Sequence, residues 1–446
     1  MSSSNTPELR RAIGLPQAVA MVVGTIIGAS IFIQPSEITG QVPSVTGIFL
    51  VWLIAGVLTF FGALVCAELA SIFTQTGGVY VYLKEAYSPC IGFLWGWAMF
   101  WSIHSGIIAA IAVIFARYTD YFVPLGNAGI KVVSIGVILV ISAVNYMGVK
   151  QGSAVQTLFT LGKVIAIVFI VILGFAIGSK SPEHFVIGDL ANTDITVNSF
   201  FLALAAGLFA FGGWHMVTYN AEETIDPRKT IPRALMLGTL IVTLCYIALN
   251  AVYMYILPLD TVTSSKRIAA DAADVLLGYG GGSFMSALVI FSTFGALSGI
   301  ILCGPRVYYS MAKDGLFFRW VGAIHPRYRT PHRAIVMQAV WSSVLVMTGT
   351  YKALFTRVIY TEWFFFALMA LGLFLLRRRL NLVRDYKIWG YPVIPAIFII
   401  SSLAIVVNQV ISDPRESVFG FSLVLAGLPV YFLWIINKRR SEGDDH

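Results

Sequence analysis

One lysine stands alone in a long uncharged run of the sequence. Lys163 is the only Asp, Glu, Lys or Arg between Gln151 and Ser179. It lies about ten residues into that run, or about 15 Å along a helix, which is too deep for easy snorkelling if the run crosses a membrane. An ionisable group at such a depth costs about 2.5–3.5 kcal/mol on membrane-insertion scales. We therefore expect the Lys163 ammonium to face a polar interior and to bind oxygen atoms there.

Two apolar runs contain clusters of small and conformationally loose residues near their middle. One cluster runs from Gly24 to Phe32, and the other runs from Phe209 to Trp214. Such clusters free backbone groups that lipid cannot satisfy, and these two lie five apolar runs apart, where two five-helix inverted repeats would place equivalent helices. Interrupted helices at matching positions in two halves are typical of a transporter binding site. The alternative interpretation is close packing of helices at small residues.

Two further sets of polar residues have more than one interpretation. His104 and His215 lie inside apolar runs, where an imidazole can either exchange protons or stay a neutral hydrogen-bonded group. The second set is charged and lies near the ends of the second, sixth and seventh runs, where it can form a gate of ion pairs or simply cap solvated helix ends. The gate candidates in this set are Glu68, Glu222, Glu223, Asp226, Lys229 and Arg233.

A series of membrane-spanning helices has to position these residues. The chain has 446 residues, of which 58% are hydrophobic and only 12% are charged, against roughly 25% charged in a soluble domain. Ten stretches without Asp, Glu, Lys or Arg reach the roughly 17–25 residues that cross a bilayer, and two more, 154–178 and about 358–376, contain one charge each. The sequence therefore predicts an all-α membrane protein with twelve transmembrane helices in a single integral domain, 1–446. The ten uncharged stretches are 12–36, 38–67, 86–116, 132–149, 195–221, 234–259, 275–305, 334–351, 388–412 and 417–437.

The distribution of basic residues predicts how these helices are oriented. With the N-terminus in the cytoplasm and alternating loops, 21 Lys and Arg residues fall on the inner side and 8 on the outer side, and Lys163 completes the 30. Because short cytoplasmic loops are enriched in Lys and Arg, both termini are predicted to be cytoplasmic. The net charge of +8 therefore needs no nucleic-acid partner. We expect a multi-pass protein of the plasma (cell inner) membrane without a cleavable signal peptide.

The sequence offers no residues for enzymatic chemistry. It contains no Walker loop, nucleophile elbow or zincin helix, and neither His104 nor His215 has Cys or carboxylate ligands at metal-binding spacing. All four cysteines lie inside apolar runs, which indicates buried free thiols rather than a disulfide framework. We therefore predict no enzyme activity, no cofactor and no metal site.

The sixth apolar run and the segment after it carry a distinctive pattern. It runs from Gly207 to Trp214, continues with Glu222 to Pro227, and ends with Ile231 to Ala234. This pattern resembles the amino acid–polyamine–organocation superfamily, and most closely its L-type amino acid transporters and their bacterial relatives. The resemblance extends through all twelve predicted spans. Supporting stretches are Gly28 to Phe32, Ala67 to Leu69, Thr76 to Gly78, Ser292 to Ala296, Gly304 to Tyr309 and Trp389 to Pro395.

The resemblance implies a leucine-transporter-like fold with five-plus-five inverted repeats and broken helices 1 and 6. Repeat one would cover about 12–178, repeat two about 197–376, and two extra helices about 388–437. Substrate would lie at mid-membrane between the breaks, where helix-end amides meet a carboxylate and freed carbonyls meet an ammonium. Phe209 would be an aromatic lid and Gly212 the floor below the substrate side chain. The residues assigned to the substrate in this way are Ile26, Ile27, Gly28, Ala29, Ser30, Ile31, Phe209, Ala210, Phe211, Gly212, Trp214 and His215.

The resemblance also gives Lys163 a role. Family members of this kind carry a lysine at the matching place in span 5, where its ammonium takes the place of a sodium ion. It implies that Lys163 bridges carbonyls at the first break to the hydroxyl of Ser292 or Thr293 in span 8, so that transport needs no sodium.

This chain also departs from the family pattern. Ala29 and Ser30 stand where a small Ser or Thr and a Gly are usual, and Phe211 and His215 stand where a tyrosine and an asparagine are common. The family's preference for neutral amino acids therefore transfers only in part. Animal members of the family that pair with a glycoprotein subunit use a cysteine in the outer loop after span 3. Residues 118–130, which form this loop here, contain no cysteine, so no disulfide-linked heavy subunit is expected.

Three functions remain in order of preference. The first is a sodium-independent secondary transporter that exchanges or imports neutral L-amino acids by alternating access. The second is a proton-coupled antiporter of amines, polyamines or cationic amino acids with the same fold, although spans 1, 3, 6 and 8 offer no carboxylate for a cation. The third is a channel or a membrane sensor, but the sequence has neither a charged ring or carbonyl filter nor a signalling domain.

Overall fold

The computed structural model describes residues 11–28, 30–178, 195–278, 280–348, 351–379 and 383–443. Within these ranges, the side chains of 149–155, 351–357 and 437–443 are outside the description. The described chain is helical, and its one β-type contact is an isolated parallel bridge between Ile13 and Thr224. This agrees with the predicted all-α fold class.

Eleven segments of the described chain are long and apolar enough to cross a membrane, which makes this a multi-pass membrane protein. The predicted ninth span corresponds to α15 (His332–Thr348), whose described part has 17 residues and so lies at the lower limit for a spanning helix. The full count of twelve therefore stays a prediction. The eleven segments are Leu15–Phe32, Val45–Ile72, Pro89–Thr119, Gly126–Tyr146, Gln156–Ile177, Val197–Glu223, Pro227–Ile256, Gly281–Lys313, Val358–Arg379, Val393–Ser412 and Pro414–Ile436.

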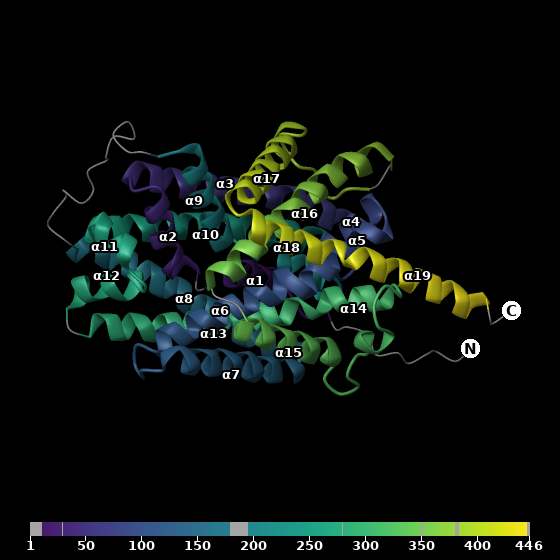
Figure 1. Cartoon of the computed structure of the whole chain (residues 1–446), viewed down its shortest axis with the longest axis horizontal. Coiled ribbons are helices and arrows are strands. Elements are labelled where there is room, and N and C mark those ends of the chain that lie inside the picture. Colours follow the sequence, from purple (N-terminus) through teal and green to yellow (C-terminus); the bar gives the residue numbers. More distant parts are fainter. Residues whose placement is uncertain are drawn as a thin grey trace.

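The long helices run roughly parallel to one another between two ends of the molecule (Figure 1). The short helices α11 (Leu259–Ser264) and α12 (Ile268–Leu277) lie at the left end of the view, and α4 (Val79–Ala86) and α14 (Pro305–Lys313) lie toward the right. The outward faces of the long helices are apolar. On α8 (Val149–Ile177), for example, Leu158, Leu161 and Ile172 are exposed, as expected for side chains that face lipid.

The first spanning segment is interrupted in its middle. Helix α1 (Leu15–Ile26) ends at the predicted break, a short 3₁₀ turn follows at Ser30–Phe32, and α2 (Gln34–Gln41) then begins. The Gly28 amide donates to the Ile26 carbonyl instead of continuing the α-helical ladder. Small residues and a proline in the first turn of α2 thus split one span into two half-helices.

The sixth spanning segment is interrupted in the same way. Helix α9 (Val197–Ala210) ends before Gly212-Gly213, and the chain resumes as a 3₁₀ helix, η5 (Trp214–Glu223). Gly213 has φ +98°, a left-handed conformation that glycine adopts at little cost. The two breaks touch each other, because the Thr25 hydroxyl donates to the Gly213 carbonyl over 3.2 Å.

The third spanning segment contains an irregularity that was not predicted. Between α5 (Pro89–Ala98) and α6 (His104–Thr119), residues Met99–Ile103 form a π-helical turn. Such turns are rare and occur frequently at functional sites. His104 begins the helix that follows this turn.

The remaining helices form the frame around the two breaks. Helix α10 packs against α1, α3 and α8, and α13 packs against α1, α6 and α8. Helix α16 contacts α17, α6 and α4. The bounds of these and the other helices are α3 (Val45–Ile72), α7 (Gly126–Tyr146), α10 (Pro227–Ile256), α13 (Gly281–Cys303), α16 (Tyr351–Arg379), α17 (Val393–Ser412), α18 (Pro414–Leu425) and α19 (Gly427–Gly443).

Candidate functional site

Lys163 lies against the break in the first span. Its side chain is 0% exposed, and its Nζ donates to the Gly24 carbonyl over 2.9 Å and to the Ile27 carbonyl over 2.6 Å. The end of α1 leaves the last carbonyls of that helix without helical partners. The ammonium of α8 supplies donors to these carbonyls, so the break and the buried charge satisfy each other.

The hydroxyls expected on the other side of Lys163 are engaged differently. Thr293 donates to the carbonyls of Val289 and Ile290 within its own helix, over 2.8 and 2.9 Å. The buried Ser292 hydroxyl has no hydrogen-bond partner among the described residues. In this conformation neither hydroxyl receives a hydrogen bond from Lys163. For Thr293 the reason is that a threonine inside a helix can donate to carbonyls of the preceding turn.

A tyrosine that sequence analysis did not single out joins the two breaks. The Tyr246 hydroxyl of α10 lies 2.9 Å from the Ile26 carbonyl and 3.0 Å from the Ala210 carbonyl. Its single hydrogen serves one of these acceptors at a time. A tyrosine among apolar residues gives no sequence signal of such a role, since most buried tyrosines pack as aromatic residues.

A narrow, largely enclosed cavity lies between the two breaks. In this conformation it has room for little more than one water molecule, so an amino acid enters only if the surrounding helices move apart. Its wall brings together residues from spans 1, 3, 6, 8 and 10. The lining residues are Thr25, Ile26, Gly28, Ser30, Ile107, Ile111, Phe209, Gly212, Gly213, Met216, Ile300, Val358 and Glu362.

Some of the residues predicted to bind substrate line this cavity and others lie beside it. Ile26, Gly28, Ser30, Phe209 and Gly212 are in its wall. The others among the described residues form the layer behind: Ile27 accepts from Lys163, and Ala210 accepts from Tyr246. Ile31 is buried in the core, and Ala29 lies outside the described residues.

The predicted aromatic residues of span 6 also divide between wall and support. Phe211 packs on Tyr246, with ring centroids 4.9 Å apart, and Trp214 packs on Phe366 of α16 at 5.0 Å. Both therefore hold the break in place rather than line the cavity. His215 is buried next to Trp214, and its ring lies 4.9 Å from that of Phe366.

The cavity contains a carboxylate that sequence analysis did not place there. Glu362 of α16 lines the cavity and is 2% exposed. Its Oε1 lies 3.7 Å from Nε2 of His215. Glu362 is the one charge in the predicted span 358–376, but its direction depends on how α16 is rotated against η5, which the sequence does not reveal. The carboxylate thus comes from span 10, outside the four spans, 1, 3, 6 and 8, that were expected to offer none.

His104 is held by a neighbouring helix. Its Nε2 lies 2.8 Å from the Ile300 carbonyl of α13, so this nitrogen carries the hydrogen. This contact fits the interpretation of a neutral, hydrogen-bonded histidine.

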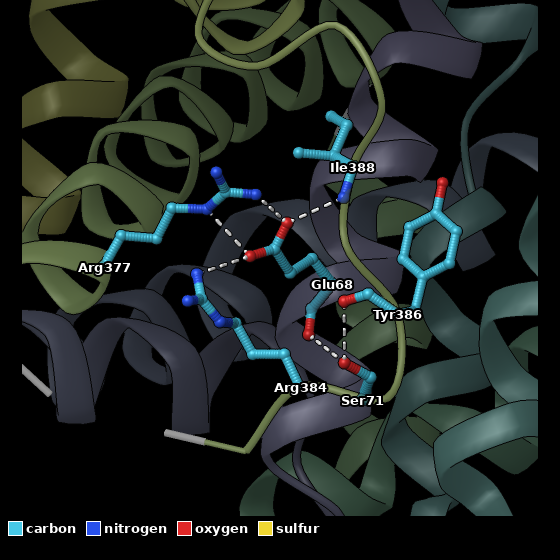
Figure 2. A network of polar contacts seen from close by, with 6 residues as sticks. All are labelled: Glu68, Ser71, Arg377, Arg384, Tyr386 and Ile388. Carbon is cyan, nitrogen blue, oxygen red and sulfur yellow. Dashed lines mark hydrogen bonds and ion pairs between the residues drawn. The ribbon is translucent and has the colours of Figure 1, made fainter. Parts of the chain in front are cut away.

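Glu68, one of the gate candidates, is the centre of a polar network (Figure 2). Its carboxylate on α3 pairs with both Nε and Nη2 of Arg377 on α16, with Nε at 2.8 Å. Nη1 of Arg384 lies 3.5 Å from Oε1 of Glu68, and the Ile388 amide donates to the same carboxylate over 2.9 Å. Burial, followed by the charge of Glu68, raises the pKa of the nearby Tyr386. The network ties span 2 to span 10 and to the segment that enters span 11.

Glu223 makes a second buried ion pair at the end of span 6. It receives hydrogen bonds from Nε and Nη2 of Arg306 on α14, both at 3.2 Å, and both side chains are fully buried. Glu222 lies 3.9 Å from Lys313 and accepts from the Thr76 amide. These contacts fasten η5 to α14 and to the loop before α4.

The other gate candidates lie on the surface. Asp226 and Lys229 form an ion pair of 3.7 Å, with side chains 55% and 63% exposed. Arg233 is exposed and has no ion pair among the described residues. These three therefore fit the interpretation of solvated helix ends.

Known proteins are similar to this sequence over almost its whole length. The profile of the amino acid permease family matches residues 13–435. The serine/threonine exchanger SteT of Bacillus subtilis (strain 168) is 33% identical over 428 residues, which cover 95% of this chain and 97% of the relative. The human b(0,+)-type amino acid transporter 1 is 30% identical over 97% of this chain and 90% of its own length. The human cystine/glutamate transporter is 30% identical over 96% of this chain and 86% of its own length. The match from the first broken span to the last helix shows that this chain belongs to the amino acid permease family, within the amino acid–polyamine–organocation superfamily.

Proposed function

We propose that this protein is a secondary transporter that binds an amino acid between the breaks of spans 1 and 6 and carries it across the membrane by alternating access. The observation that carries this proposal is the meeting of freed helix ends from both spans at one cavity. Neutral L-amino acids are the preferred substrates, and sodium-independent exchange or uptake is the preferred mode. The names of the relatives, which include an exchanger and two amino acid transporters, support the same class of function.

A zwitterion suits the chemistry of this cavity at both of its ends. The amides that begin the half-helix after Gly28 offer donors and a positive dipole end to a carboxylate. The carbonyls that end α1 and α9 offer acceptors to an ammonium. Lys163 and Tyr246 already donate to some of these carbonyls, but a carbonyl oxygen has a second lone pair.

Lys163 supports sodium independence. Its ammonium is fixed within hydrogen-bond distance of two carbonyls at the first break, and carbonyl oxygens are also what a sodium ion would need there. Two cations at this distance in a low-dielectric interior would repel each other strongly. An ammonium held at these carbonyls therefore makes a sodium ion at the same place unnecessary.

The ion pairs of Glu68 and Glu223 support an inner gate. They join α3 to α16 and η5 to α14. The positive-inside distribution of Lys and Arg favours a cytoplasmic location for this end. Breaking these pairs would open the cavity inward. We place the protein in the plasma membrane with both termini cytoplasmic, and without a disulfide-linked heavy subunit.

A proton-coupled antiporter of amines or cationic amino acids is the second candidate. Glu362 is the observation that favours it, because a carboxylate in the cavity wall can hold a cation. The pair it forms with His215 could also take up a proton.

Counterflow in proteoliposomes tests both candidates. Vesicles containing the purified protein are loaded with each of the twenty amino acids or with polyamines, and entry of a labelled substrate is followed with and without a pH gradient. We expect neutral amino acids to stimulate entry, and the pH gradient to have little effect. Stimulation by polyamines alone, together with a requirement for the pH gradient, would favour the second candidate.

A further inference from the structure

Several buried polar atoms in the cavity wall or beside it lack hydrogen-bond partners. Oε1 of Glu362, both ring nitrogens of His215 and the hydroxyl of Tyr219 have no hydrogen-bond partner among the described residues. Buried polar groups in folded proteins are nearly always hydrogen-bonded. Four such atoms within one neighbourhood therefore point to a ligand that supplies the missing partners.

These groups come from two neighbouring elements, and Glu362 is the one among them that lines the cavity. Glu362 projects from α16, whereas His215 and Tyr219 belong to η5, and the rings of His215 and Tyr219 lie 5.4 Å apart. Aromatic side chains pack around the imidazole, with Trp95 at 6.0 Å and Phe366 at 4.9 Å. The unpaired polar atoms thus form a small polar cluster surrounded by aromatic side chains.

The same cluster opens onto the proposed substrate site. Glu362 lines one cavity with Gly28, Ser30 and Gly212, so a substrate whose main chain meets the breaks has its side chain within this cavity. Lys163 cannot neutralise Glu362, because its ammonium is directed to the carbonyls of Gly24 and Ile27. Among the described residues, the ionisable group within ion-pair distance of Glu362 is His215.

We propose that Glu362 determines specificity and, with His215, receives a hydrogen-bond donor from the substrate side chain, either a hydroxyl or an ammonium. This inference rests on the proposed function and adds the class of side chain that the site selects. An apolar side chain would leave these atoms unpaired, and leaving a buried polar atom unpaired weakens binding roughly tenfold or more. A side chain with a donor recovers that loss.

Two matched pairs of amino acids test the proposal. Serine differs from alanine by one hydroxyl, and lysine differs from norleucine by one ammonium. Competition of each against labelled alanine in counterflow gives a preference ratio for each pair. The variants are Glu362→Gln, which keeps the shape but replaces one oxygen by an NH₂ group, and Glu362→Met, which removes the acceptor. Glu85→Gln, on a side chain that is 44% exposed, is the matched control.

We expect the wild-type protein to prefer the donor-bearing member of at least one pair by about tenfold or more. Glu362→Met should reduce this ratio to near one, because it removes the acceptor. Glu362→Gln should reduce it several-fold, because the amide replaces one carboxyl oxygen by an NH₂ group, which cannot accept a hydrogen bond. The ratio of Glu85→Gln should equal that of the wild type.

Two results would overturn the inference. One is a wild-type protein that exchanges alanine but prefers neither serine nor lysine to its apolar counterpart. The other is an unchanged ratio in Glu362→Gln or Glu362→Met, and the Gln variant decides if the Met variant does not fold. Failure of the proposed function itself would look different, since the wild-type protein would then show no amino acid counterflow at all.

Discussion

At the scale of the residue, the buried ammonium of Lys163 lies against the first break. It donates to two carbonyls that α1 cannot satisfy by itself, and hydrogen bonds to charged groups contribute about 1.5–3 kcal/mol each. Removing it would leave both carbonyls without this donor in a region that lipid and apolar side chains surround.

We predict that Lys163→Met lowers amino acid exchange by at least tenfold, because the two carbonyls lose a charged donor worth more than the 1.4 kcal/mol that corresponds to tenfold. Exchange per folded protein is measured in proteoliposomes. The control is Lys131→Met, which removes an exposed hydrogen bond to the Met347 carbonyl. If Lys163→Met exchanged amino acids at the wild-type rate, the ammonium would not be needed for transport.

Sequence reasoning found some of these residues and missed others for physical reasons. Lys163 was visible because a lone charge in a long apolar run is expensive. Glu362 was visible as a charge, but its direction follows from helix rotation and packing. Tyr246 was invisible, since its hydroxyl finds carbonyls of two other spans that are distant in sequence. Ser292 and Thr293 were assigned by resemblance, and the hydroxyl of Thr293 binds its own helix instead.

At the scale of the element, the contact between the two breaks decides the geometry of the site. Gly213 turns the chain out of α9 with a positive φ and lies against Thr25 of α1. A Cβ atom on Gly213 would come within 3.2 Å of Thr25, besides straining the backbone. Both breaks could be predicted from runs of small residues, whereas the π-helical turn at Met99–Ile103 has no comparable signal.

We predict that Gly213→Ala reduces exchange strongly, because it adds both backbone strain and a close contact between the breaks. Gly280→Ala separates the two effects, since Gly280 has φ +100° with nothing within 4 Å of its Cβ position. It should lose stability but keep its exchange rate per folded protein. Equal losses of exchange in both variants would show that strain alone is responsible.

The ion pairs at the ends of the spans lead to a second prediction, which concerns the stability of the packed helices. In Glu68→Gln the new amide group faces donors from Arg377 and Ile388, and breaking a buried pair typically costs about 3–5 kcal/mol. We expect the apparent Tm of the purified protein to fall clearly. Asp226→Asn, which removes an exposed pair worth about 0–1 kcal/mol, should leave it nearly unchanged. A Glu68→Gln protein as stable as Asp226→Asn would contradict the importance of this network.

At the scale of the whole molecule, the sequence predicted the class of fold well. Charge-free stretches identified the spanning helices, because the cost of burying charge in lipid restricts where charges occur. The pairing of helices around the site was not predictable in the same way, since it depends on contacts between spans. The match to the amino acid permease family over residues 13–435 agrees with the resemblance that began at Gly207 to Trp214.

In the proposed mechanism, the buried ammonium of Lys163 takes the place of a sodium ion in an amino acid carrier. The most direct test is exchange of a labelled neutral amino acid by the purified wild-type protein in proteoliposomes, with sodium completely replaced by choline and then with an imposed inward sodium gradient. We predict equal exchange in both conditions. Uptake that rises in proportion to the sodium gradient would contradict the claim.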